Sequence, residues 1–225
     1  MNENQNLRYD LLKANQYDVE NAKACYEFIA GNITAGQPEV RTDNNELADG
    51  IYLMRNDGVA VPFTGQTFTD VEKSLYTGGV GVKLGNKSLV VAMGDTYEDE
   101  TELTKCKGGT RFITDYHDAV ADWNGKENTD DIRSILHDNA RISDDMHIPS
   151  LGELYFILLH IRDINAALKA IGGKPLAGWY WSSTQFSAAI AWLLNLGNGG
   201  ASNGYSKAST QGRVRAVSAF LPLNS

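Results

Sequence analysis

The sequence lacks several features that would place it in a common functional class. Its 225 residues include only two cysteines, Cys25 and Cys106, and four histidines, and none of them lies in a spacing typical of a zinc site or a redox pair. No apolar run approaches the length of a membrane-spanning helix. We therefore expect no metal, no cofactor and no insertion into a membrane.

Positive charge is also scarce. The chain has 20 Lys and Arg against 28 Asp and Glu, a formal net charge of −8. Nucleic-acid-binding proteins usually gather Lys and Arg on one face, so we expect no nucleic-acid partner. The first residues, Met-Asn-Glu-Asn-Gln-Asn, have neither the basic nor the apolar part of a signal peptide. The expectation is synthesis in the cytoplasm without a signal peptide, with free thiols.

Signatures of catalysis are missing as well, and we expect no enzyme. No serine lies in a nucleophile elbow. The carboxylates of Asp130-Asp131 and Asp144-Asp145 cannot face each other on a helix, so we expect them to cap or solvate helix starts. The acidic run 95–102 lacks the spacing of an EF-hand and is expected to be a solvated loop.

The pattern of apolar residues predicts one main domain preceded by a helical appendage. Residues 17–30 carry apolar side chains at helical spacing, and the polar stretch 32–49, which contains Gly and Pro, is typical of a linker. We place an N-terminal helix and linker at 1–45 and the main domain at 46–225.

Local patterns in the main domain predict an α+β fold. Strand–turn–strand patterns occur at 51–63, around Asp57-Gly58, and at 80–93. Helices are expected at 115–123 and at 129–137, the latter capped by Thr129. A long helix is expected at 151–171: Ser150 and Glu153 form a capping box before it, and Gly172-Gly173 follows it. This helix should pack on a sheet that contains 191–196 and 213–220.

Between Gln185 and Gly212 the only ionised side chain is Lys207. In the strand 191–196, alternation sends Trp192, Leu194 and Leu196 to one face, which we expect to be the core. Leu193 would then be exposed in a contact patch, although a strand buried on both faces explains the same pattern. We expect Trp181, Trp192, Leu194 and Val214 to be largely buried.

Several of these segments resemble a known family. They are Tyr-Trp-Ser-Ser-Thr at 180–184, Ala-Trp-Leu-Leu-Asn-Leu at 191–196, Lys207, Arg-Val-Arg-Ala-Val at 213–217, and the stretches 148–155 and 164–173. The chain resembles C-type-lectin-like variable proteins of diversity-generating retroelements, as in gut Bacteroides and their phages, and the related C-terminal domains of Legionella collagen-like adhesins. The resemblance implies a C-type-lectin-like fold, with a variable region at about 184–212 rewritten by an error-prone reverse transcriptase.

Such retroelements replace adenines in asparagine-rich templates. With a final pyrimidine kept, this replacement can yield Phe, Leu, Ile, Ala, Gly, Ser, Tyr or Asn, but never Lys, Glu, Gln, Met or Trp. Gln185, Trp192, Lys207 and Gln211 are therefore expected to be fixed scaffold. The positions expected to be variable and to bind the ligand are Phe186, Ala189, Ile190, Leu193, Gly197, Asn198, Gly200, Ser202, Asn203, Gly204, Tyr205, Ala208 and Ser209. Glycine- and serine-rich hairpins without any retroelement share this composition.

The resemblance implies a non-enzymatic protein that binds a host-surface protein or glycan through this region. It would act in a phage tail fibre, on the virion, or in bacterial surface display. The alternative is an adhesin or structural domain of the same fold with fixed specificity. Residues 1–45 could support a homo-oligomer.

Overall fold

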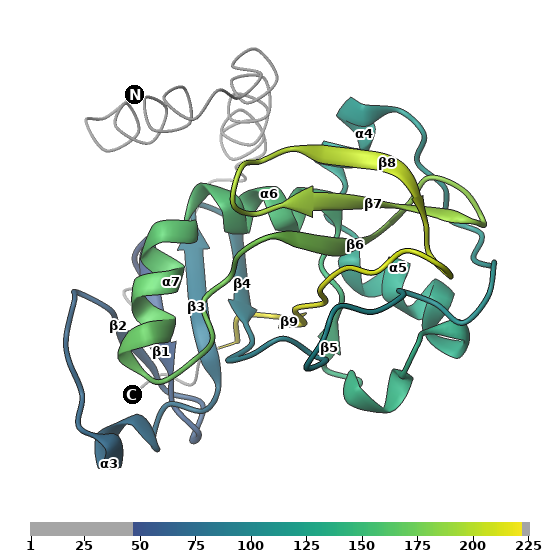
Figure 1. Cartoon of the computed structure of the whole chain (residues 1–225). Helices are drawn as coiled ribbons and strands as arrows, with labels where there is room; N and C mark the ends of the chain where they lie inside the picture. Colours follow the sequence, from purple (N-terminus) through teal and green to yellow (C-terminus); the bar gives the residue numbers. More distant parts are fainter. Residues whose placement is uncertain (1–46, 222–225) are drawn as a thin grey trace.

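Two antiparallel sheets, with helices packed around them, organise the chain (Figure 1). The computed structural model describes residues 47–221. The predicted helix at 17–30, Cys25 and the proposed role of 1–45 in oligomerisation lie outside the described residues. Within them the fold contains helices and antiparallel sheets and is therefore α+β, as predicted.

The larger sheet has six strands in the order β2-β1-β3-β4-β9-β5. Their bounds are β1 Gly50–Met54, β2 Ala60–Pro62, β3 Gly79–Leu84, β4 Lys87–Val91, β5 Met146–His147 and β9 Val217–Ser218. Both predicted hairpins are confirmed, because β1 pairs with β2 and β3 pairs with β4. Gly58 and Gly85 supply the positive φ of the two turns, 85° and 58°. The short helix α3 (Asp70–Lys73) lies between β2 and β3.

The smaller sheet has three strands in the order β6-β7-β8. They are β6 Trp179–Gln185, β7 Ile190–Asn195 and β8 Ala201–Ser206. The prediction that 213–220 shares a sheet with 191–196 is wrong, since β9 pairs with β4 and β5 instead. After residue 212 the chain follows the segment beyond β4: Thr96 N donates to Val214 O and Ala92 N to Ala216 O, at 2.8 and 3.2 Å. Arg213 also exchanges backbone hydrogen bonds with Trp179 and Trp181 of β6, at 3.0 and 2.9 Å, so the C-terminal segment links the two sheets.

The helices before residue 150 agree with the prediction only in part. Helix α4 (Tyr116–Ala121), capped by Asp115, is confirmed. The helix expected at 129–137 is wrong, because α5 runs from Gly125 to Ile132 and is followed by the 3₁₀ turns η1 (Arg133–Ile135) and η2 (Asn139–Arg141). Thr129 does not cap a helix. It is buried inside α5, and its hydroxyl donates to the Gly125 carbonyl at 2.7 Å.

The long helix predicted at 151–171 is broken at His160 into α6 (Leu151–Leu159) and α7 (Ile161–Ala170). The capping box of Ser150 and Glu153 is confirmed. So is the stop at Gly172, which has a φ of 84°. Helix α6 is buried nearly all round, whereas α7 buries one side only. The break lets the chain pass from the core to the surface, a change that one straight amphipathic helix would not make.

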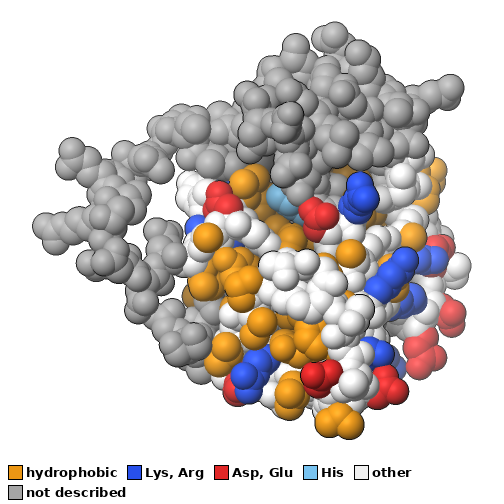
Figure 2. All heavy atoms as spheres, turned by 90° about the vertical axis from the view of Figure 1, so that its left-hand side faces the viewer, with side chains coloured by type: hydrophobic (Ala, Val, Ile, Leu, Met, Phe, Trp, Pro, Cys, Tyr) orange, Lys and Arg blue, Asp and Glu red, His pale blue; other side chains and the backbone are white. Residues whose placement is uncertain are grey.

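The main core lies between the larger sheet and α6 and α7, and it extends to β6 and β7. It draws on residues from Leu53 to Val217, so the described chain shows no division into separate cores near residue 110. The predicted burial of Trp181, Trp192, Leu194 and Val214 is confirmed. Figure 2 shows the end of the molecule formed by α3, β2 and α7, where hydrophobic side chains form groups separated by charged and polar ones. Among residues 47–221 no helix has the length and apolarity needed to cross a bilayer.

Candidate functional site

Strand β8 forms one edge of the smaller sheet, and all six of its residues are half-buried or exposed. At the rise typical of a strand it is about 20 Å long. Tyr205 is the largest exposed side chain on it, 44% exposed, and its ring meets Trp179 edge-on, with the centroids 6.5 Å apart. The contact with the Trp179 ring restricts the Tyr205 side chain. Binding a ligand through Tyr205 would therefore cost little conformational entropy.

Two turns extend this edge. The turn between β7 and β8 is held by Asn195 Oδ1, which accepts from the N–H groups of Gly197 and Asn198 at 2.8 and 3.2 Å, and by Gly199, with a φ of 72°. The turn between β6 and β7 carries Phe186, whose ring packs on Trp192 with the centroids 5.9 Å apart. Both turns are therefore anchored while part of their surface stays open.

We call the exposed and half-buried residues of β8 and these turns the display face. Of the thirteen predicted ligand-binding positions, five are exposed, seven are half-buried and one is buried. The exposed ones are Gly197, Asn198, Gly204, Tyr205 and Ser209. The half-buried ones are Phe186, Ala189, Ile190, Gly200, Ser202, Asn203 and Ala208. These twelve lie on β8, in the β6–β7 and β7–β8 turns, at the start of β7 and just after β8 (Figure 1).

Leu193 is the exception, and its predicted exposure is wrong. It is 2% exposed and packs in a second apolar cluster with Trp181, Ala191 and Val214. The predicted alternation of β7 is correct, but both faces are covered, because the returning segment crosses the face that carries Leu193. At Gly212 any Cβ would lie only 3.3 Å from Leu193 Cδ2. Leu193 is scaffold.

Three of the four positions expected to be fixed scaffold are buried. Trp192 is 4% exposed, and Gln185 and Lys207 are fully buried, whereas Gln211 is exposed. Lys207 Nζ donates to Gly108 O at 2.7 Å and to Gln185 Oε1 at 2.6 Å. Burial lowers the pKa of Lys207 to about 8, against the attraction of nearby anionic groups.

Asp131 continues this network and corrects another prediction. It was expected to cap or solvate a helix start, but it accepts hydrogen bonds from Gln185 Nε2 at 2.8 Å and from the N–H and hydroxyl groups of Thr110 at 2.7 and 2.6 Å. Burial raises the pKa of its carboxyl, but these hydrogen bonds outweigh burial and lower the pKa to about 2. Asp131 therefore ties the 108–111 loop to the end of β6. Its neighbour Asp130 instead forms ion pairs with Lys126 and Arg133.

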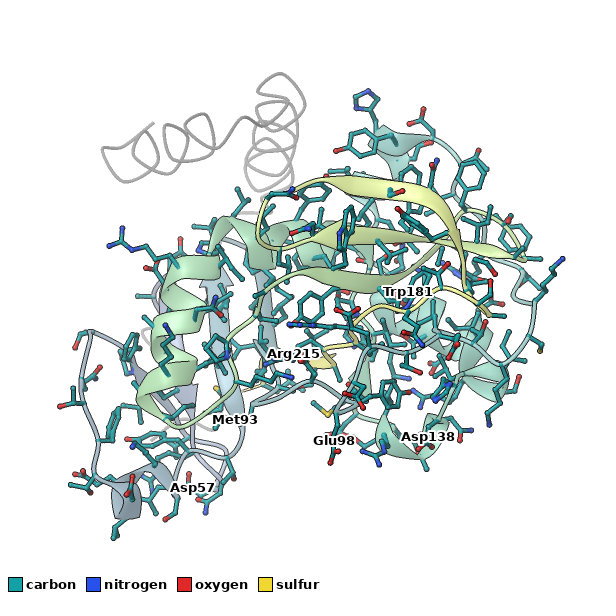
Figure 3. The ribbon with its side chains drawn as sticks, in the orientation of Figure 1. Asp57, Met93, Glu98, Asp138, Trp181 and Arg215 are labelled. Atoms are coloured by element: carbon teal, nitrogen blue, oxygen red, sulfur yellow. The ribbon has the colours of Figure 1, made fainter. Side chains whose placement is uncertain are left out.

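A buried ionic cluster under the smaller sheet was missed by the sequence analysis. Asp95 was assigned to a solvated loop, yet its side chain is 4% exposed. Its Oδ1 accepts from Arg215 Nε and Tyr180 Oη, both at 2.9 Å, and its Oδ2 lies 2.7 Å from Lys174 Nζ. Burial alone would raise the pKa of Asp95, but Lys174 and Arg215 outweigh it and hold the pKa below its ordinary value. Figure 3 labels Arg215 near the middle of the molecule, below Trp181.

The remaining polar features include one buried pair of side chains and one cavity. His147 lies 3.1 Å from Glu153 Oε1, with both side chains nearly enclosed, and in residues 47–221 no three His, Cys, Asp or Glu side chains gather as metal ligands. A cavity of about 310 Å³ is lined by residues from 97–101 and 137–141. Figure 3 labels Glu98 and Asp138 at this cavity, on the side of the molecule away from β8.

Comparison with known proteins gives little further guidance. No family model and no curated protein matches the chain. A solved structure that is similar is a fimbrial protein from Bacteroides ovatus ATCC 8483, with a TM-score of 0.45 and 17% sequence identity. The match covers 76% of this chain and 48% of that one, so the chain spans about half the length of the fimbrial protein. A similarity at this level supports no conclusion about family or function.

Proposed function

We propose that the chain is a non-enzymatic ligand-binding protein in which a C-type-lectin-like scaffold presents a diversified display face. The observation that carries the proposal is the separation of residue types in space. Of the thirteen positions predicted to be variable, twelve are exposed or half-buried and Leu193 is buried. Of the four residues expected to be fixed because adenine replacement cannot produce them, Gln185, Trp192 and Lys207 are buried and Gln211 is exposed.

The topology is compatible with a C-type-lectin-like fold. In that fold the termini lie close together and the last strands and loops build the binding surface. Here β1 and β9, the first and last strands described, belong to the same sheet, whereas β7 and β8 form a separate one that carries the display face. Rearranging residues on β8 would therefore leave the pairing of the larger sheet unchanged.

The chemistry of the display face favours a protein or glycan on a host surface as the ligand. Charged side chains are absent from the thirteen positions, and Tyr, Ser, Asn and Gly supply aromatic contact and adaptable hydrogen bonds, as in antibody loops. Tyr205 and Phe186 are the expected anchors of binding energy. A phage tail fibre or a bacterial surface-display protein would use such a surface.

The first test is the tolerance of the display face. We expect a variant with Asn198→Ser, Tyr205→Ser and Ser209→Asn to keep its fold, since surface substitutions usually change stability by less than about 0.5 kcal/mol each. The melting temperature should fall by no more than about 5 °C. Circular dichroism during heating measures it.

A display library extends the same test to binding. Positions 198, 202, 203, 205 and 209 are randomised to the reachable residues, shown on yeast and selected on purified lysozyme; a matched library randomises 185, 192, 194, 207 and 214. We expect most clones of the first library to be displayed and some to bind, and most clones of the second to be lost from the surface. Equal loss in both libraries would show that β8 and its turns are part of the core and would contradict the proposal.

A further inference from the structure

The buried amide of Gln185 lies between a lysine amine and a carboxylate. Gln185 ends β6, Lys207 directly follows β8, and Asp131 belongs to α5. Lys207 Nζ is 2.6 Å from Oε1 of the amide, and Asp131 Oδ2 is 2.8 Å from its Nε2. Gln185 and Lys207 are both fully buried. An amine and a carboxylate thus contact the two polar atoms of one buried carboxamide.

The distances permit attack on the amide carbon. A carbonyl bond is about 1.23 Å long, so Nζ at 2.6 Å from Oε1 lies within about 3.8 Å of Cδ. Productive attack requires a separation of about 3–3.5 Å, which a small rotation of the lysine chain can supply. The amide itself is held in place: a Cβ at Gly109 would overlap the Gln185 side chain, and Gly109 has a φ of 91°. The amide therefore stays near the amine.

The amine can reach its nucleophilic form. Only the neutral form of lysine attacks a carbonyl carbon. Burial lowers the pKa of Lys207 from 10.5 to about 8, so about a tenth of the side chains are neutral near pH 7. The neighbouring carboxylate of Asp131, with its pKa of about 2, is ionised, and its Oδ2 already contacts the nitrogen that would leave, 2.8 Å from Nε2.

We infer that Lys207 and Gln185 form an intramolecular isopeptide bond after folding. Neutral Nζ attacks Cδ of Gln185 and forms a new C–N bond. Asp131 takes one proton from the attacking nitrogen and passes it to Nε2. The bond between Cδ and Nε2 then breaks, ammonia leaves, and Asp131 returns to its ionised state. Atoms and charge balance without an oxidant or a further reactant.

This bond would close a covalent loop around the display face. The segment 185–207 contains all the predicted ligand-binding positions except Ala208 and Ser209. Closing a loop restricts the unfolded chain and so stabilises the folded one. The ends of the segment would then stay joined whatever residues the display face carries. The inference concerns the ends of the segment and does not depend on whether the face is diversified.

The test is mass spectrometry of the purified, denatured full chain and of its tryptic peptides. Trypsin cleaves after Lys169 but not at Lys174-Pro175, so Gln185 and Lys207 fall in one peptide. We expect no cleavage after the acylated Lys207. The expected product is the peptide from Ala170 to Arg213, lighter than its sequence by one ammonia, with fragment ions that join Lys207 to Gln185. An unmodified peptide that ends at Lys207 would overturn the inference.

Controls separate this bond from another loss of ammonia. The Asn198-Gly199 and Asn203-Gly204 pairs can form succinimides, which have the same mass deficit but leave Lys207 open to trypsin. Lys207→Arg should abolish the deficit, and Lys174→Arg, a matched change at another lysine, should keep it. A deficit that persists in Lys207→Arg would assign it to succinimide and refute the isopeptide bond.

Discussion

Replacing Asp95 by alanine is expected to lower the free energy of unfolding by about 3–5 kcal/mol, because it leaves the charge of Arg215 buried without its partner. Arg215 is fully buried, and its Nη1 and Nη2 donate to Ala92 O and Lys174 O, both at 2.9 Å, so it cannot reach solvent without breaking these bonds. Urea denaturation measured by fluorescence gives the change. A loss below about 1 kcal/mol would show that Arg215 is solvated.

Two controls accompany Asp95→Ala. Lys174→Ala removes a partner that is half exposed, so we expect a loss within about 1 kcal/mol. Adding Arg215→Met to Asp95→Ala removes the unpaired charge and should restore part of the stability.

The pH dependence of the free energy of unfolding has the same origin. Since the pKa of Asp95 is lowered in the folded protein, its contribution is present above the unfolded pKa and is lost as the pH falls through the folded value.

Leu193→Asn is expected to destabilise the protein by about 3–5 kcal/mol, through the cavity left by the leucine and the unpaired amide placed in the core. The side chain packs against Trp181 and Val214 in the second cluster. The matched change is Tyr205→Asn on the neighbouring strand, which is 44% exposed and should cost much less. Thermal denaturation of the two variants separates scaffold from display face. Equal losses of stability in the two variants would contradict the assignment of Leu193 to the scaffold and of Tyr205 to the display face.

Local chemistry explains which parts of the fold could be predicted from sequence. The hairpins, the helix near 116–121, the Ser150–Glu153 capping box and the stop at Gly172 depend on neighbouring residues, and all were predicted correctly. The break at His160 and the move of residues 217–218 to the larger sheet could not be predicted. They depend on contacts between distant segments, such as Thr96 with Val214.

Prediction of the candidate site from sequence was limited in the same way, by contacts between distant segments. Codon chemistry indicated that Gln185, Trp192, Lys207 and Gln211 are fixed scaffold, and the structure buries the first three but leaves Gln211 exposed. Codon chemistry misassigned Leu193, because adenine replacement can produce leucine and nothing nearby in sequence shows that residues 208–214 cover it. Asp95 and Asp131 were missed because their partners, Arg215 and Gln185, lie 120 and 54 residues away. Arg215 stands between the apolar residues Val214 and Ala216, and this is the one local signal that could have indicated a buried acidic partner.

The most direct measurement of the central claim is deep sequencing of the gene from a natural population, together with the DNA that follows it. The account predicts a near-identical repeat of the segment that encodes 184–212, and substitutions confined to adenine positions of that repeat. Substitutions should fall on the twelve exposed or half-buried positions predicted to be variable, while the codons for Gln185, Trp192 and Lys207 stay unchanged and Leu193 stays apolar. Absence of the repeat, or substitutions spread evenly over buried and exposed codons, would contradict a diversified surface and favour an adhesin of fixed specificity.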